Sequence, residues 1–101
     1  PVTTAFGVDP QDPLRLDLTE PCEVARRLRD WGVNLINVSL GNPYANPHFV
    51  RPAEFPPIDG YHAPEHPLLG VMRHLDAAAT IQAAVPEVPV VGSGYSWLQD
   101  F

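Results

Sequence analysis

The feature that most constrains the fold is the segment Val33 to Ser39, which is apolar on both of its sides. A strand of this composition is typical of the centre of a parallel sheet, where helices cover both faces. Such a strand also needs a neighbouring strand along each edge. The clearest further strand is Val88 to Val91, so these elements do not complete a sheet. We therefore expect residues 1–101 to form a single partial domain of a larger structure.

A first helix is predicted between Thr19 and Gly32. Thr19 is a suitable N-cap, and Gly32 is a suitable residue to end the helix at the C′ position. The apolar residues Val24, Leu28 and Trp31 recur at helical spacing and predict the buried stripe, together with Pro21 and Ala25. We expect Trp31 to be an anchor of the core.

A second helix is predicted from Pro67 to about Ala84, because proline suits the first turn of a helix. Pro86 follows and closes it. The predicted buried face comprises Leu68, Val71, Met72, Leu75 and Ala79. His74 is expected on the surface of this helix.

The remaining segments are rich in proline. Residues 1–18 are expected to be irregular, with a short strand at Val2 to Phe6, and Asn42 to Glu65 form a long loop of the kind that carries function. The resulting order of helices and strands indicates right-handed βαβ connections and a parallel sheet. An open α/β sheet and a (β/α)₈ barrel both fit this order, and both bind ligands at the C-terminal ends of their strands.

The strand Val88 to Val91 runs into the turn Gly92-Ser93-Gly94 and then into a predicted helix start. Glycines at this spacing allow positive φ and a close approach of a ligand to the backbone. Backbone N–H groups in such a turn, together with the positive end of a helix, are a common grip for phosphate. The same residues are also typical of an ordinary tight turn.

Charge and cysteine content narrow the class of protein. The net charge of −6 argues against nucleic acid and anionic membrane as main partners. No apolar run has the length of about 18 residues that a membrane span needs. The single Cys22 has no partner for an internal disulfide and is expected to be inert packing, in agreement with a cytoplasmic location. His62, Glu65 and His66 resemble a metal motif, but Pro64 and Pro67 interrupt the helical spacing, so no metal is expected.

Two stretches carry a resemblance to a known family. They are the helix and strand joint from Ala25 to Gly41, and the segment Ile81 to Gly94 with its glycine ending. Together they resemble FMN-dependent oxidoreductases of the old yellow enzyme type. Residues 41–48 and 64–68 are similar to a bacterial branch of dienoyl-CoA reductase-like members. The resemblance implies a fragment of a (β/α)₈ TIM barrel, with its sixth strand at Val33 to Ser39 and its seventh at Val88 to Val91.

The resemblance also implies a cofactor and site residues. FMN would be held through its phosphate by backbone groups of Ser93, Gly94, Tyr95 and Ser96, although typical members have a small residue where this chain has Tyr95. The implied residues that line the substrate site are Tyr44, His48 and Arg51. The implied reaction passes hydride from NAD(P)H through FMN to an activated alkene or similar acceptor. No catalytic residue of the family has a counterpart in this chain, so we expect it to be inactive alone.

Two other functions remain open. A non-flavin barrel enzyme, such as an aldolase or isomerase, would use the same turn for a phosphorylated substrate. Alternatively, the chain is a catalytically silent domain that associates with another copy of itself and so buries its unpaired strand edges.

Overall fold

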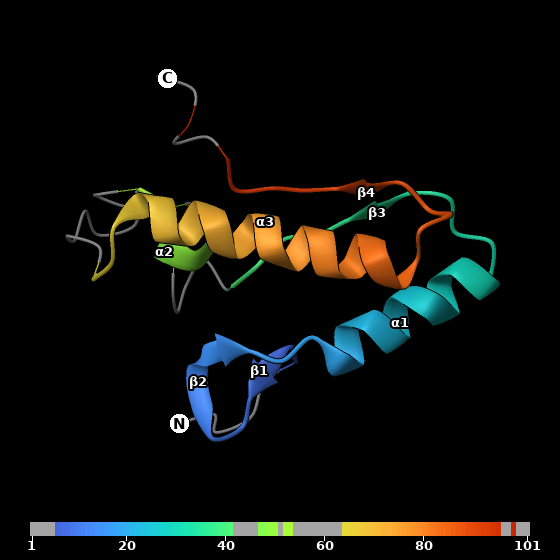
Figure 1. Ribbon diagram of the computed structural model, residues 1–101, viewed down its shortest axis with the longest axis horizontal. Coiled ribbons are helices and arrows are strands. Elements are labelled where there is room, and N and C mark those ends of the chain that lie inside the picture. Colours follow the sequence, from blue (N-terminus) through green and yellow to red (C-terminus); the bar gives the residue numbers. More distant parts are fainter. Residues whose placement is uncertain (1–5, 42–46, 51, 54–63, 96–97, 99–101) are drawn as a thin grey trace. The chain divides into compact units, whose positions relative to one another are not determined.

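The computed structural model describes residues 6–41, 47–50, 52–53, 64–95 and 98 (Figure 1). The chain divides into two compact units: the first contains Pro1–Ile36 and Ala79–Val90, and the second contains Asn37–Ala78 and Val91–Phe101. In chain order the elements are β1 (Val8–Asp9), β2 (Asp12–Leu16), α1 (Thr19–Asp30), β3 (Ile36–Asn37), α2 (Pro47–Val50), α3 (Pro67–Ala84) and β4 (Val90–Val91).

The first unit begins with a β-hairpin. Strands β1 and β2 pair in antiparallel fashion, with Val8 opposite Leu16. The side chain of Asp9 accepts a hydrogen bond from the N–H of Gln11 at 2.8 Å, which is a local bond that stabilises a turn. The expectation of irregular structure is therefore wrong for residues 8–16, because a turn nucleated by Asp9 allows its flanks to pair. The predicted strand at Val2 to Phe6 lies outside the described residues except for Phe6, which is in a turn.

Helix α1 has a well-defined start and end. Leu18 is the N-cap and Thr19 is the first helical residue, so the N-cap prediction is wrong by one position. Asp17 accepts hydrogen bonds from the Thr19 hydroxyl at 2.7 Å and the Thr19 N–H at 3.1 Å. At the other end, Gly32 has φ +93° and the N–H of Val33 donates to the Leu28 carbonyl. This is a Schellman motif, and it confirms the predicted stop at Gly32.

The buried face of α1 agrees with the prediction at Ala25 and Cys22 and differs from it at Val24 and Trp31. Cys22 and Ala25 are buried, whereas Trp31 is 76 % exposed and Val24 is also exposed. The Cys22 Sγ lies 4.0 Å from the carbonyl oxygen of Thr80 in the last part of α3. Small side chains on this face allow the two helical segments to approach closely, so Trp31 is not a core anchor.

Gln82 organises the connection between α3 and β4 in the first unit. Its amide nitrogen donates hydrogen bonds to the carbonyls of Val85 at 3.1 Å and Val88 at 2.8 Å. Its amide oxygen accepts from the N–H of Val90 at 3.0 Å. The buried residues beside this network are Ile81, Val85 and Val88. One side chain therefore fixes the path of the backbone from the end of the helix into the strand.

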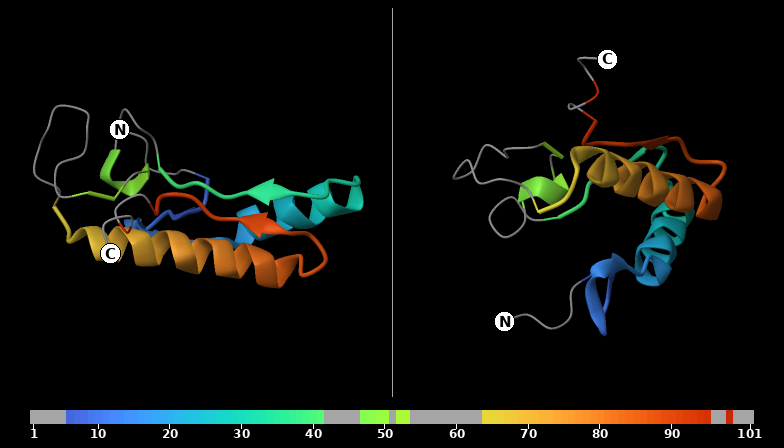
Figure 2. Two further views of the ribbon diagram at one scale, coloured as in Figure 1. Left: turned by 90° about the horizontal axis from the view of Figure 1, so that it is seen from above. Right: turned by 60° about the vertical axis from the view of Figure 1, so that its left-hand side comes forward.

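Strands β3 and β4 are neighbours in a second sheet. The Ile36 N–H donates to the Pro89 carbonyl in the first unit, and the Val38 N–H donates to the Val91 carbonyl in the second. Donor and acceptor numbers rise together, so the strands are parallel (Figure 2, left).

The predicted barrel fragment with strands six and seven is wrong. The described residues form two separate two-stranded sheets, one of them antiparallel. The predicted strand Val33 to Ser39 reduces to Ile36–Asn37, and Leu35, Asn37 and Ser39 around it are exposed. A central barrel strand requires partners on both edges. Among the described elements β3 has one partner, β4.

Helix α3 covers Pro67–Ala84, which confirms the predicted bounds. Its buried face differs from the prediction at most positions. The buried residues are Pro67, Gly70, Val71, His74, Ala77 and Ile81. The residues Leu68, Leu69, Met72 and Leu75 are exposed, and we call them the α3 outer face. The helix has an apolar stripe on each of two faces, so its periodicity alone does not select the buried one.

Candidate functional site

The candidate site lies in the second unit, where the glycine loop Gly92 to Tyr95 follows β4. Gly94 has φ +84°, a conformation that favours glycine. The Ser93 hydroxyl donates to the side-chain carbonyl oxygen of Asn37 at 2.9 Å. Because Asn37 ends β3, this bond ties the loop to the carboxyl ends of two parallel strands. Ligands in α/β sheets bind at such ends.

Four backbone N–H groups of the glycine loop could donate hydrogen bonds to a ligand. The N–H groups of Gly92, Ser93, Gly94 and Tyr95 make no hydrogen bond to another described residue. All four residues are half-buried, so these donors are not surrounded by bulk water on every side. The carbonyl of Tyr95 accepts a hydrogen bond from the N–H of Leu98 at 2.9 Å. Successive N–H groups around a left-handed glycine form a concave site for an anion.

Neighbouring side chains explain why positions 92 and 94 are glycine. A Cβ built on Gly92 would lie 1.8 Å from the Tyr95 Oη, and a Cβ on Gly94 would lie 2.6 Å from His74 Nε2. Tyr95 and His74 therefore fill the space that each missing side chain leaves. A ligand does not have this space, so it would contact the loop through the N–H groups of residues 92–95.

His74 is the buried polar centre of the site, with an exposed fraction of 1 %. Its Nε2 is 2.5 Å from the Phe49 carbonyl of α2, and the Tyr95 ring meets the imidazole edge to face with centroids 6.4 Å apart. Nδ1 has no hydrogen-bond partner within the described part of the chain. Burial lowers the pKa of His74 below its ordinary 6.5, the bond to Phe49 opposes this shift, and the positive charge of Arg73 adds to it. The expectation of a surface histidine is wrong.

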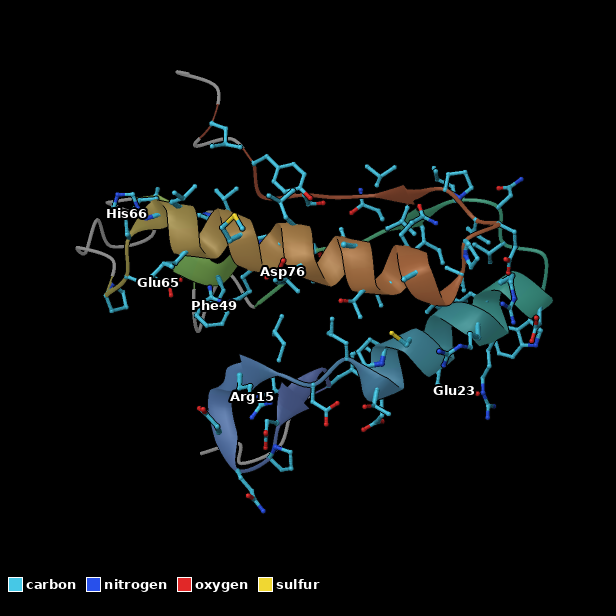
Figure 3. The ribbon with its side chains drawn as sticks, in the orientation of Figure 1. Arg15, Glu23, Phe49, Glu65, His66 and Asp76 are labelled. Atoms are coloured by element: carbon cyan, nitrogen blue, oxygen red, sulfur yellow. The ribbon has the colours of Figure 1, made fainter. Side chains whose placement is uncertain are left out.

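Arg73 links α3 to α2 and to Glu65, which precedes α3, next to His74. Its guanidinium lies 3.9 Å above the centroid of the Phe49 ring, which is cation–π geometry. Two of its nitrogens donate to the two carboxylate oxygens of Glu65, at 2.7 and 2.6 Å. Figure 3 shows Phe49 and Glu65 beside the first half of α3. This bidentate pair is only slightly exposed, so water screens it weakly.

The structure places only part of the predicted site. Ser93, Gly94 and Tyr95 lie together in the glycine loop, while Ser96 lies outside the described residues. Tyr44 and Arg51 also lie outside them, and His48 belongs to α2 but its side chain is not described. The predictions that these residues bind cofactor or substrate stay predictions.

The sequence predicted neither the contact of His74 with the loop nor the residues around His74. The residues around it are Phe49, which bonds His74, and the pair of Arg73 and Glu65. One signal for His74 was present, because it follows Pro67, Gly70 and Val71 at helical spacing on one face. The contact between His74 and Phe49 joins residues 25 positions apart, and no local pattern indicates it.

Within the described ranges, no group of three or more His, Cys, Asp or Glu side chains is arranged to hold a metal ion. No described helix is both long enough and apolar enough to cross a membrane. The chain matches no protein-family model, no curated protein and no solved structure.

Proposed function

We propose that the glycine loop binds the phosphate of FMN, within an oxidoreductase that passes hydride from NAD(P)H to an activated alkene or similar acceptor. The observation that supports binding is the set of four N–H groups at the carboxyl ends of two parallel strands, without partners among the described residues. The choice of FMN rests on the resemblance of residues 25–41 and 81–94 to flavin oxidoreductases. The proposal does not require a barrel.

The proposed roles are limited to binding. Backbone N–H groups of Ser93, Gly94 and Tyr95 would donate to phosphate oxygens, and the bond from Ser93 to Asn37 would hold the loop in position. FMN, when bound, supplies the hydride chemistry, and the protein supplies binding and orientation. Because His74 and Tyr95 fill the sides of the glycines, the flavin ring would lie away from these two positions. No described residue is proposed as catalytic.

A titration of FMN into the chain, followed by flavin fluorescence, tests this proposal. Riboflavin, which lacks the phosphate, and inorganic phosphate serve as the two comparison ligands. We expect FMN to bind more tightly than riboflavin and phosphate to compete with FMN. Equal binding of FMN and riboflavin would contradict a phosphate grip. Binding of phosphate without any preference for FMN would favour the non-flavin aldolase or isomerase alternative.

Variants at Ser93 sharpen the test. Ser93→Asp places a negative charge in the loop, and Ser93→Asn has nearly the same size without the charge. Repulsion between the carboxylate and the phosphate should weaken FMN binding by about tenfold or more, which corresponds to ~1.4 kcal/mol. The asparagine variant should retain most of the affinity. Equal effects of both variants would show that the loop does not face an anion.

The α3 outer face favours self-association as a second candidate function. Leu68, Met72 and Leu75 recur at helical spacing and are exposed together with Leu69. An apolar stripe of this kind marks an interface more often than open surface. We expect sedimentation velocity to show dimers at high concentration, and Met72→Gln with Leu75→Gln to abolish them. Ala83→Gln, at an exposed position of the same helix, is the control. A monomer at all concentrations would contradict self-association.

A cytoplasmic location also stays a proposal. The observation in its support is the lone Cys22, which is buried and has no second cysteine with which to pair.

A further inference from the structure

His74 joins three separate segments of the second unit. It belongs to α3, its Nε2 meets the Phe49 carbonyl of α2, and its ring fills the space over Gly94 in the glycine loop. Tyr95 of the same loop packs against the imidazole edge to face. The contacts of one side chain therefore hold α2 and the loop against the helix.

The protonation state of His74 follows from these contacts. A carbonyl oxygen only accepts hydrogen bonds, so Nε2 must carry a hydrogen to bond Phe49. In the neutral ring Nδ1 then carries a lone pair and no hydrogen. A second proton would bind at Nδ1, where no acceptor lies within the described part of the chain. The protonated ring would be a buried cation with an unsatisfied donor, which is a costly arrangement.

The described groups around His74 do not balance such a charge. From α2 the ring meets an uncharged carbonyl, and from the glycine loop it meets Gly94 and the phenol of Tyr95. From its own helix the charged group that acts on it is Arg73, which is also positive. The carboxylate of Glu65 is engaged in both oxygens by Arg73.

We propose that His74 is a pH-dependent latch, which fastens α2 and the glycine loop to α3 while the imidazole is neutral and releases them when it is protonated. The inference is independent of phosphate binding, because it rests on contacts inside the protein. Release requires the ring to leave its site for water. The Phe49 carbonyl then loses its donor, and Gly94 loses the ring on which it packs.

Hydrogen exchange and NMR on the whole chain test the latch. The ring signals of His74 are titrated from pH 8 to pH 4. Amide protection factors, corrected for the intrinsic pH dependence of exchange, are measured at residues 48–50 of α2 and at Leu98, whose N–H donates to the Tyr95 carbonyl of the glycine loop. We expect His74 to titrate below 6.5. Between 6.5 and the folded pKa, protection at these amides should fall about tenfold for each pH unit, as expected for one linked proton. Amides in the middle of α1 should keep their protection.

Two variants separate the latch from other causes. His74→Gln keeps a side-chain donor for the Phe49 carbonyl and never gains a proton, so its protection should not change with pH. His66→Asn removes an exposed imidazole and should behave like the wild type. Loss of protection in His74→Gln at the same pH as in the wild type would overturn the proposal. If His74→Gln does not fold, the wild-type protein is used alone. Loss of amide protection at a pH where the His74 ring does not titrate would overturn the latch. Loss of protection together with titration of the ring would support it.

Discussion

Gly94 packs directly on the imidazole of His74, and a Cβ at Gly94 would lie 2.6 Å from both Cε1 and Nε2 of that ring. Real Cβ atoms do not approach other heavy atoms this closely, so the contact requires glycine. The positive φ of +84° requires it as well. Two independent constraints, one conformational and one steric, therefore act at the same residue of the candidate site.

Gly94→Ala should lower the free energy of unfolding by more than the conformational strain alone. Gly32 is a matched control, because it has φ +93° but no atom within 4 Å of its hypothetical Cβ. Gly32→Ala should cost about 1 kcal/mol from strain, and Gly94→Ala should cost ~2–4 kcal/mol because strain and overpacking add. Urea unfolding of both variants measures the difference. Equal costs would contradict the close contact with His74.

Gly92→Ala should destabilise the chain through Tyr95. The new methyl group would lie 1.8 Å from the Tyr95 Oη and 2.6 Å from Cζ, so the phenol must move. We expect a cost of about 1–3 kcal/mol in the wild-type background and a much smaller one in a Tyr95→Ala background. A double-mutant cycle of thermal unfolding measures the coupling between the two residues. Additive effects would show that Tyr95 does not fill the space over Gly92.

Glu65→Gln should weaken the anchoring of Arg73. The carboxylate accepts two short hydrogen bonds from a weakly exposed guanidinium. A glutamine amide keeps one of the two acceptor oxygens and has an NH₂ group in place of the other. We expect a loss of ~1–3 kcal/mol in the free energy of unfolding. Glu23→Gln is the control, because its contacts to Arg26 and Arg27 are exposed and 3.5 Å long. That variant should change stability little. A similar small effect at both sites would argue against the bidentate pair.

Thr19→Ala should raise the pKa of Asp17. The hydroxyl of Thr19 is the main cause that holds this pKa below 3.8, and its N–H is the second cause. A group with a lowered folded pKa stabilises the folded chain above its unfolded pKa, so this contribution is present above 3.8 and is lost as pH falls through the folded pKa. NMR titration of the Asp17 carboxyl gives the shift directly. Thr19→Ser should restore the wild-type pKa, and a failure to do so would contradict the role of the hydroxyl.

Parts of the fold follow from local patterns and parts do not. The bounds of α3 were predictable because Pro67 and Pro86 punctuate a continuous helical segment, and Gly32 marked the end of α1. The buried faces were not predictable in the same way. In α3 the stripe with Leu68, Met72 and Leu75 is exposed, and the stripe with Val71, His74 and Ile81 is buried. Long-range packing made this choice.

The barrel prediction failed for a related reason. The composition of Val33 to Ser39 indicates burial, but a strand forms only where a partner strand runs beside it. β3 pairs over a short stretch with β4, and several of its neighbours are exposed. The glycine loop was located from its spacing alone, since strand and turn are local features. Its contact with α2 through His74 depends on the tertiary fold.

The three hydrogen bonds of Gln82 have a consequence for how the β3 and β4 pair is aligned. The N–H of Val90 is held by a side chain of the preceding helix, so the last turn of α3 determines where β4 begins. The position of β4 along β3 is thus set by the end of α3. The two short strands therefore do not need further strands to fix their alignment. A glutamate at position 82 would offer acceptors only. The carbonyls of Val85 and Val88 would then lose the donor that they now share.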